Sequence, residues 1–338
     1  MSTLANPVPL PRWPSRLRYP LRRFLQAIPL VVLIMVLNFF LLRLAPGDLA
    51  DVMAGEAGAA TPEYMASLRK EFGTDRPLAT QFAAYAKRMS HFDLGWSFRY
   101  NRSVLQLILD RLPATGMLMG ASLLLALFSG CALGTFSALA RWRGFDLLVS
   151  TVSTIGFATP LFWLGLMLIV LFSAHLGWLP SGGMVTLGIT QSGVSRLLDI
   201  GAHLVLPVTC LTLYYLAIYA RLMRASVLEV RQLDFVRTAR AKGLSPLATV
   251  TGHIVPNALL PIVTMTAVQF GALFSGSVAV ETVFSWPGIG QLALDAVASR
   301  DLNLLLGILL FSSVLVLAVN LATDLVYPWF DPRAQVQR

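Results

Sequence analysis

The chain has 338 residues, of which 56% are hydrophobic and only 13% are charged, and its mean hydropathy is +0.69. This composition excludes an ordinary soluble domain and indicates a protein that crosses the membrane several times. The formal net charge of +9 comes from Lys and Arg clusters beside apolar segments. It therefore predicts an orientation in the lipid bilayer and no nucleic-acid partner.

Six apolar segments are long enough to cross a membrane, since about 20 residues rising about 1.5 Å each span a hydrocarbon core of about 30 Å. They are residues 24–44, 115–139, 147–174, 203–222, 259–283 and 302–326. The sequence thus predicts an all-α integral membrane protein with six transmembrane helices. We interpret the first helix as an uncleaved anchor, because it lies far from any small-residue cleavage site.

These spans divide the chain into predicted regions. They are an amino-terminal segment (1–23), a first transmembrane helix (24–45), an external segment (46–112), a transmembrane domain (113–326) with a central loop (223–257), and a carboxyl-terminal tail (327–338). Arginines precede the first span, and further Arg and Lys clusters follow the second and fourth spans. Because consecutive spans alternate in direction, these clusters share one side, and the positive-inside rule places both termini and the central loop in the cytoplasm.

The external segment is the only candidate for a folded region outside the bilayer. Residues 62–72 are predicted to form a short helix that ends at Gly73. Leu78, Phe82, Tyr85 and Met89 then recur at helical spacing, which predicts a second helix with one apolar face. We expect this face to pack on the membrane helices, and a ligand-binding role is the alternative.

Motifs for catalysis are absent from the sequence. It contains no GxxxxGK[ST] phosphate loop, no HExxH metal motif and no GxSxG elbow. Its four histidines are scattered without metal-ligand spacing, and Cys131 and Cys210 lie inside apolar segments. We therefore expect a protein that is not an enzyme and binds neither a metal nor a cofactor. The remaining classes are a conduit, a carrier and an anchor.

The central loop is basic and amphipathic. Its apolar residues Leu228, Phe235, Val236 and Ala239 are predicted to lie on one side of short helices, opposite Arg231, Arg237, Arg240 and Lys242. Gly243 then ends a helix by taking a positive φ, and Ser245-Pro246 starts another. This pattern predicts a helix, a turn and a second helix that a partner grips, and the alternative is an ordinary polybasic loop beside the membrane.

The stretch RTARAKGLSPLATVTGHIVPNALLP, which starts at Arg237, resembles the cytoplasmic signature loop of binding-protein-dependent ABC importer permeases, in particular their dipeptide/oligopeptide branch. Arg237, Thr238 and Ala239 fill the first places of the family pattern, where Glu-Ala-Ala is general. Gly243 keeps the glycine, and residues 253–256 close the pattern with its spacing intact. Shorter matches to the same branch occur at residues 45–48, 74–78, 92–95, 162–165, 176–180 and 281–290.

The resemblance implies a fold, a set of partners and a location. The fold is the type I ABC importer permease fold in a bacterial inner membrane. The partners are a second homologous permease subunit, two cytoplasmic ATPase subunits that bind ATP and Mg, and an external solute-binding protein. The implied solutes are di- and oligopeptides, with the same machinery importing a metal chelate as the alternative. Rival classes are a secondary transporter and a membrane anchor for a signalling complex, although neither coupling carboxylates nor inverted repeats are evident.

The resemblance also implies two sets of site residues. Those expected to couple this chain to the ATPases are Asp234, Arg237, Thr238, Ala239, Arg240, Gly243, His253 and Pro256. Gln269 and Asn320 are polar groups at membrane depth and should face protein or a water-filled path. Glu281 and Trp286, at the outer end of the fifth span, are candidates for an external gate.

Overall fold

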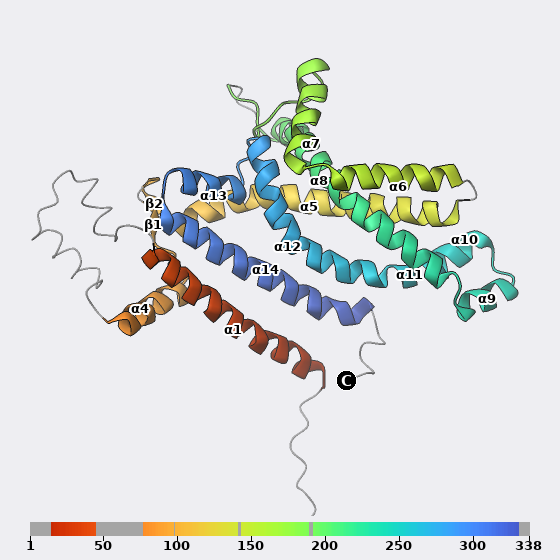
Figure 1. The fold of residues 1–338 in the computed structure, drawn as a ribbon, viewed down its shortest axis with the longest axis horizontal. Helices are drawn as coiled ribbons and strands as arrows, with labels where there is room; N and C mark the ends of the chain where they lie inside the picture. Colours follow the sequence, from red (N-terminus) through yellow and green to blue (C-terminus); the bar gives the residue numbers. More distant parts are fainter. Residues whose placement is uncertain (1–14, 45–76, 98, 141–142, 189–191, 331–338) are drawn as a thin grey trace, which may run out of the picture. The chain divides into compact units, whose positions relative to one another are not determined.

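The computed structural model describes residues 15–44, 77–97, 99–140, 143–188 and 192–330, most of which are helical (Figure 1). They belong to two compact units. The first contains α1 (Ser15–Leu44), α4 (Leu78–Ser90) and residues Leu309–Val326 of α14. The second runs from Leu94 to Ile308.

In the first unit, α4 packs on α1 through aromatic rings. The Phe82 and Tyr85 rings lie with their centroids 5.4 Å and 5.8 Å from that of Phe39. Burial raises the pKa of the Tyr85 phenol, while Arg88 and a hydrogen bond with Asn38 oppose that rise. The predicted helix with an apolar face is therefore confirmed, and the helix predicted over residues 62–72 lies outside the described residues.

The second unit opens with a short hairpin. Its strands β1 (Trp96–Ser97) and β2 (Arg102–Ser103) are antiparallel, with Trp96 opposite Ser103. The helices that follow are α5 (Val104–Leu139), α6 (Arg143–Ala158), α7 (Leu161–Leu168) with the π-helical turn η1 (Ile169–His175), and α8 (Val194–Val230). Next come α9 (Asp234–Ala241), α10 (Pro246–Thr249), the π-helical turn η2 (Val250–Ile254), α11 (Val255–Ala258), α12 (Leu260–Val283), α13 (Ile289–Ala298) and α14 (Leu302–Phe330).

Helices α5 and α8 form the centre of this unit because two glycines let their backbones approach closely. A Cβ at Gly130 would lie 2.6 Å from the Cβ of Tyr219. A Cβ at Gly134, one turn further along, would overlap the carbonyl oxygen of Ala220. Small residues four apart are a common means of packing helices in membranes, where lipid gives no hydrophobic drive for association. The sequence analysis did not single out this pair.

In the part of the chain that the structure describes, helices of membrane-spanning length occur at up to five of the six predicted places, and the first predicted span contains a shorter apolar helix, Leu25–Leu41. Among the described residues, α5, α8 and Leu302–Thr323 are each long and apolar enough to cross a membrane. Two further pairs qualify as bent spans, Leu147–Ala158 with Leu161–His175 at 106° and Pro246–Ala258 with Leu260–Gly271 at 41°. The third predicted span is thus broken and not one straight helix, because Pro160 lacks an N–H and disfavours helical backbone at Thr159.

Candidate functional site

Helix α9 projects from the end of α8 and is held to the second unit by one face. Val236 and Ala239 are 0% and 5% exposed, and Val236 joins the same apolar core as Val230 of α8 and Ile254 and Ala258 beyond α10. The opposite face leaves Asp234, Phe235, Arg237, Thr238 and Arg240 exposed to solvent. The helix is therefore anchored firmly to its neighbours while it presents charged and aromatic groups outward.

Two details of this helix differ from the sequence prediction. Phe235 is 37% exposed and does not share the buried face, because consecutive helical residues differ by about 100° in direction, whereas Val236 and Ala239 are three apart. Ala239 is buried within the chain. Its small side chain therefore serves packing inside this subunit, and Ala241 is the exposed small residue.

Polar contacts at the start of α9 are local. Thr238 Oγ1 donates to the Asp234 carbonyl oxygen at 3.0 Å, and Arg237 Nη1 lies 3.4 Å from Asp234 Oδ1. The side chains of this ion pair are 74% and 94% exposed. Such solvent-exposed pairs hold weakly. The Arg237 guanidinium is thus accessible to a partner.

The carboxyl end of α9 is a Schellman motif built on Gly243. The Gly243 N–H donates to the Arg240 carbonyl at 3.0 Å, and the Leu244 N–H donates to the Ala239 carbonyl at 3.3 Å. This pair of bonds requires a left-handed residue after the helix, and Gly243 has φ +82°. The helix ends as the sequence predicted.

The chain restarts with a cap and then widens before a proline. Ser245 Oγ accepts the Ala248 N–H at 3.2 Å, and Pro246 occupies the first turn of α10. In a regular helix, the Pro256 ring would clash with the carbonyl four residues earlier. The π-helical turn η2 lies immediately before α11 and widens the helix at this point. Asn257 Nδ2 donates to the His253 carbonyl at 2.7 Å. His253 and Pro256 thus shape the return to α12.

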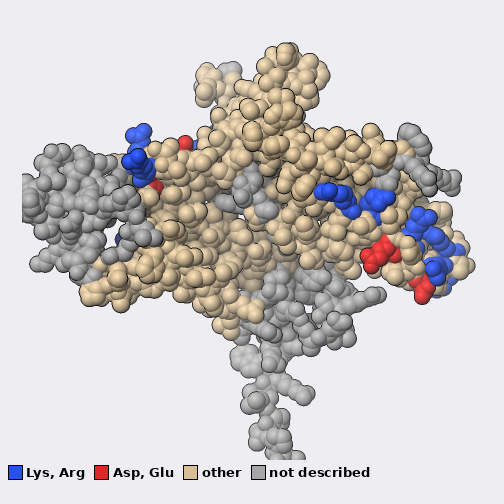
Figure 2. All heavy atoms as spheres, viewed as in Figure 1, with Lys and Arg blue, Asp and Glu red and all other residues tan. Residues whose placement is uncertain are grey.

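Cations dominate the outer surface of this loop. Figure 2 shows Lys and Arg side chains gathered over α9 and α10, with acidic side chains beside them. The exposed cations there are Arg231, Arg237, Arg240 and Lys242. The hairpin and α13 lie at the other end of the second unit (Figure 1).

A second site lies where α12 meets α13. The Glu281 carboxylate is 0% exposed and accepts hydrogen bonds that include those from Thr115 Oγ1 at 2.8 Å and from the Gln291 N–H at 3.1 Å. Thr115 Oγ1 accepts the Ile289 N–H at 2.8 Å. Both oxygens of the carboxylate thus receive donors, one of them from the first turn of α13, where the helix dipole favours negative charge.

Trp286 closes this junction from the α12–α13 turn. Its ring is 0% exposed, and its indole N–H donates to the Ala114 carbonyl of α5 at 2.9 Å. Any Cβ at Gly288 would overlap the Glu281 carboxylate, which explains a glycine there. Sequence reasoning found Glu281 and Trp286 but missed Thr115, because a threonine 166 residues away carries no local signal. Their role as a gate stays a prediction.

The other two candidates for the translocation path, Gln269 and Asn320, belong to different units of the structure. Gln269 is 5% exposed within α12 of the second unit. Asn320 is exposed on the part of α14 that belongs to the first unit. Their predicted place along a translocation path remains a prediction.

These features define a helical membrane subunit with a projecting basic loop. The family model described as "Binding-protein-dependent transport system inner membrane component" matches residues 130–336, and that described as its N-terminal membrane component matches residues 16–119. The chain belongs to this family of transport-system permeases.

Two relatives align over nearly the whole chain. One is the "Di/tripeptide transport system permease protein DppB" of Pseudomonas aeruginosa (strain UCBPP-PA14), 38% identical, covering 94% of this chain and 98% of the relative. The other is the "probable peptide ABC transporter permease protein y4tP" of Sinorhizobium fredii (strain NBRC 101917 / NGR234), 38% identical, covering 93% and 98%. A chain of the MetNI methionine ABC transporter, in inward-facing conformations, matches with TM-score 0.53 at 18% identity over 67% of this chain and 96% of that chain. The fold is therefore that of the type I ABC importer permeases.

Proposed function

We propose that the protein is a permease subunit of a peptide importer and forms half of a transmembrane path for di- or oligopeptides. Two relatives that are 38% identical over more than nine tenths of the chain are named for peptide transport. We propose a peptide as the solute on the basis of these two relatives. A second, homologous permease completes the path. An external solute-binding protein delivers the peptide, and two cytoplasmic ATPase subunits drive its passage.

The α9–α11 loop is the element that receives the ATPase. Its exposed side offers Arg237, Arg240 and the Phe235 ring, which suit a cleft with acidic and apolar groups. Its inner side packs against α8, because Val236 and Ile254 belong to the same apolar core as residues of α8. A pull on α9 therefore moves packed helices as a body, which is the kind of switching that a transporter needs.

ATP and Mg belong to the partner subunits in this proposal. The chain has no GxxxxGK[ST] loop, so it lacks the usual backbone cradle for nucleotide phosphates. The cations of the α9–α11 loop put this end of the second unit in the cytoplasm by the positive-inside rule. Both termini then lie in the cytoplasm of a bacterium, and the hairpin with α13 faces outward.

Reconstitution of the complete assembly in nanodiscs and in liposomes tests this function. We expect ATP hydrolysis to rise when the peptide-loaded binding protein is added, and radiolabelled dipeptide to accumulate in the liposomes. The isolated chain should hydrolyse no ATP. Stimulation of ATP hydrolysis by a metal chelate with no response to peptides would contradict the proposed solute. Nucleotide turnover by the isolated chain would contradict the assignment of ATP hydrolysis to the partner subunits.

A further inference from the structure

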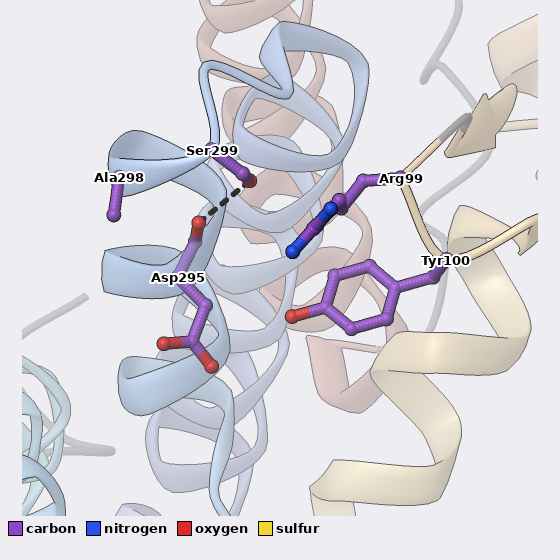
Figure 3. Close-up of a pocket in the computed structure, with 5 residues that line it drawn as sticks. All are labelled: Arg99, Tyr100, Asp295, Ala298 and Ser299. Carbon is purple, nitrogen blue, oxygen red and sulfur yellow. Dashed lines mark hydrogen bonds between the residues drawn. The ribbon is translucent and has the colours of Figure 1, made fainter.

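An open pocket of about 560 Å³ lies between the hairpin and α13. Its walls are Arg99 and Tyr100 from the hairpin turn and Asp295, Ala298 and Ser299 from α13 (Figure 3). The Arg99 side chain and the Tyr100 hydroxyl both point toward α13 across the opening (Figure 3). None of these residues belongs to the α9–α11 loop or to the Glu281 junction.

Hydrogen bonds tie the hairpin to the residues that directly follow α13. Ser97 Oγ donates to Asp301 Oδ2 at 2.5 Å, and Asn303 Nδ2 donates to the Trp96 carbonyl at 3.3 Å. Within the hairpin, the Tyr100 N–H donates to Ser97 Oγ at 3.3 Å. The pocket is therefore preformed, which lowers the entropy that a ligand would lose on binding.

The pocket contains one strong hydrogen-bond donor, the Arg99 guanidinium, that has no partner among the described residues. No ion pair or hydrogen bond engages the Arg99 guanidinium among the described residues, whereas Arg102 in the same hairpin pairs with Asp110 at 2.9 Å. The Ser299 hydroxyl already donates a hydrogen bond to the Asp295 carbonyl at 2.7 Å. Arg99 and the Tyr100 hydroxyl are thus free to donate to an acceptor that comes from outside.

The surroundings favour a protein over a free small molecule. Small-ligand sites enclose most of their ligand, whereas this pocket is open, and Trp96 of the hairpin and Val297 of α13 are 45% and 55% exposed. Trp, Tyr and Arg are the residues that contribute most to binding at protein interfaces, and Trp96, Arg99 and Tyr100 stand together in one hairpin. The hairpin also lies at the opposite end of the second unit from α9 and α10 (Figure 1).

We infer that this pocket is a docking point for the external solute-binding protein, which inserts an acidic side chain against Arg99 and Tyr100. The inference rests on the proposed function, because that function places the hairpin outside the cell. The carboxylate accepts bidentate hydrogen bonds from the guanidinium and a third from the phenol. Asp295, on the facing wall, repels the incoming charge and so limits the affinity, which lets the binding protein leave after delivery.

Affinity measurements on the whole assembly test the docking point. The probe is the solute-binding protein that stimulates ATP hydrolysis of the wild-type assembly in nanodiscs, and its Kd is measured by biolayer interferometry at several salt concentrations. Arg99→Ala should weaken binding about tenfold or more and flatten its salt dependence. Arg99→Lys should lie between, since a lysine supplies charge without the bidentate fork.

Two further variants separate this docking mode from its alternatives. Arg102→Ala is the matched control, because Arg102 belongs to the same hairpin but does not line the pocket, and binding should stay within about twofold of wild type. Asp295→Asn should tighten binding severalfold by removing a like charge. Basal ATP hydrolysis, measured without the binding protein, should be unchanged in Arg102→Ala.

Each opposite result overturns the inference. Wild-type affinity in Arg99→Ala would exclude the pocket from docking. Weaker binding in Asp295→Asn would mean that a cationic group, such as the amino end of a zwitterion, occupies the pocket instead of a carboxylate. If no binding protein stimulates the wild-type assembly, the proposed function itself fails, and that result is distinct from a failure of Arg99 alone.

Discussion

Replacement of Gly243 by valine is the sharpest test of the coupling loop. Gly243 holds φ +82°, a region that costs other residues about 1–2 kcal/mol and is least tolerated by β-branched side chains. Apart from its neighbours along the chain, a Cβ there would meet no atom of the described residues within 4 Å. The cost within the subunit is therefore the backbone conformation alone, and any larger effect must come from a bound partner.

That cost converts into an expected loss of association. Since about 1.4 kcal/mol corresponds to a tenfold change, keeping the Schellman turn in Gly243→Val should weaken ATPase binding roughly 5- to 30-fold. We expect normal membrane insertion, because the turn lies outside the membrane spans in the proposed topology. Gly243→Asn should retain most of the association, since asparagine enters the left-handed region more readily.

Gly188 provides a matched control. It has φ +85°, and a Cβ there would also meet no other described residue within 4 Å, so the backbone strain of Gly188→Val is similar to that of Gly243→Val. The measurements are copurification of the ATPases and the number of peptides transported per ATP hydrolysed in proteoliposomes. Equal losses in the two variants, or normal coupled transport by Gly243→Val, would refute the role of the loop as the coupling element.

Four more substitutions test the packing that supports these sites. Gly134→Val should destabilise the protein by about 1–3 kcal/mol in thermal unfolding because it forces α5 from α8, whereas Gly120→Ala on the same helix, where a Cβ meets nothing within 4 Å, should be neutral or stabilising by about 0.5–1 kcal/mol. Glu281→Gln should cost about 1–3 kcal/mol in the same assay, since an amide group turns a donor toward Thr115 or the Gln291 N–H. Ser245→Ala should cost about 1 kcal/mol and speed amide hydrogen exchange at Ala248, while unchanged exchange there would show that the cap is dispensable.

Local signals in the sequence predicted the helical elements well. Apolar length alone located the membrane helices, and a glycine followed by Ser-Pro located the end of α9 and the start of α10. These predictions succeed because a helix end or an apolar span depends on neighbouring residues. Pro160 is a local signal for the break in the third span, but the prediction used hydropathy averaged over the whole segment and therefore did not include the break.

Contacts between distant residues were not predictable from one sequence. Thr115 meets Glu281 across 166 positions, and the pocket joins the hairpin turn at Arg99 to Asp295 on α13. Nothing near Arg99 in the sequence distinguishes it from Arg102, whereas in the structure Arg99 lines the pocket and Arg102 pairs with Asp110. Residue type predicts what a group is able to do, but its neighbours in space decide whether that capacity is already used.

Helix α12 gives the two ends of the second unit a mechanical connection. It begins directly after the loop that carries α9, α10 and α11, and its other end holds Glu281. Glu281 bonds to the first turn of α13 and to Thr115 of α5, so a tilt of α12 must either carry α13 with it or break buried hydrogen bonds. Breaking them costs more than moving a short helix whose outer face is exposed. We therefore expect force applied at α9 to reach α13, and with it the pocket wall that carries Asp295, through α12.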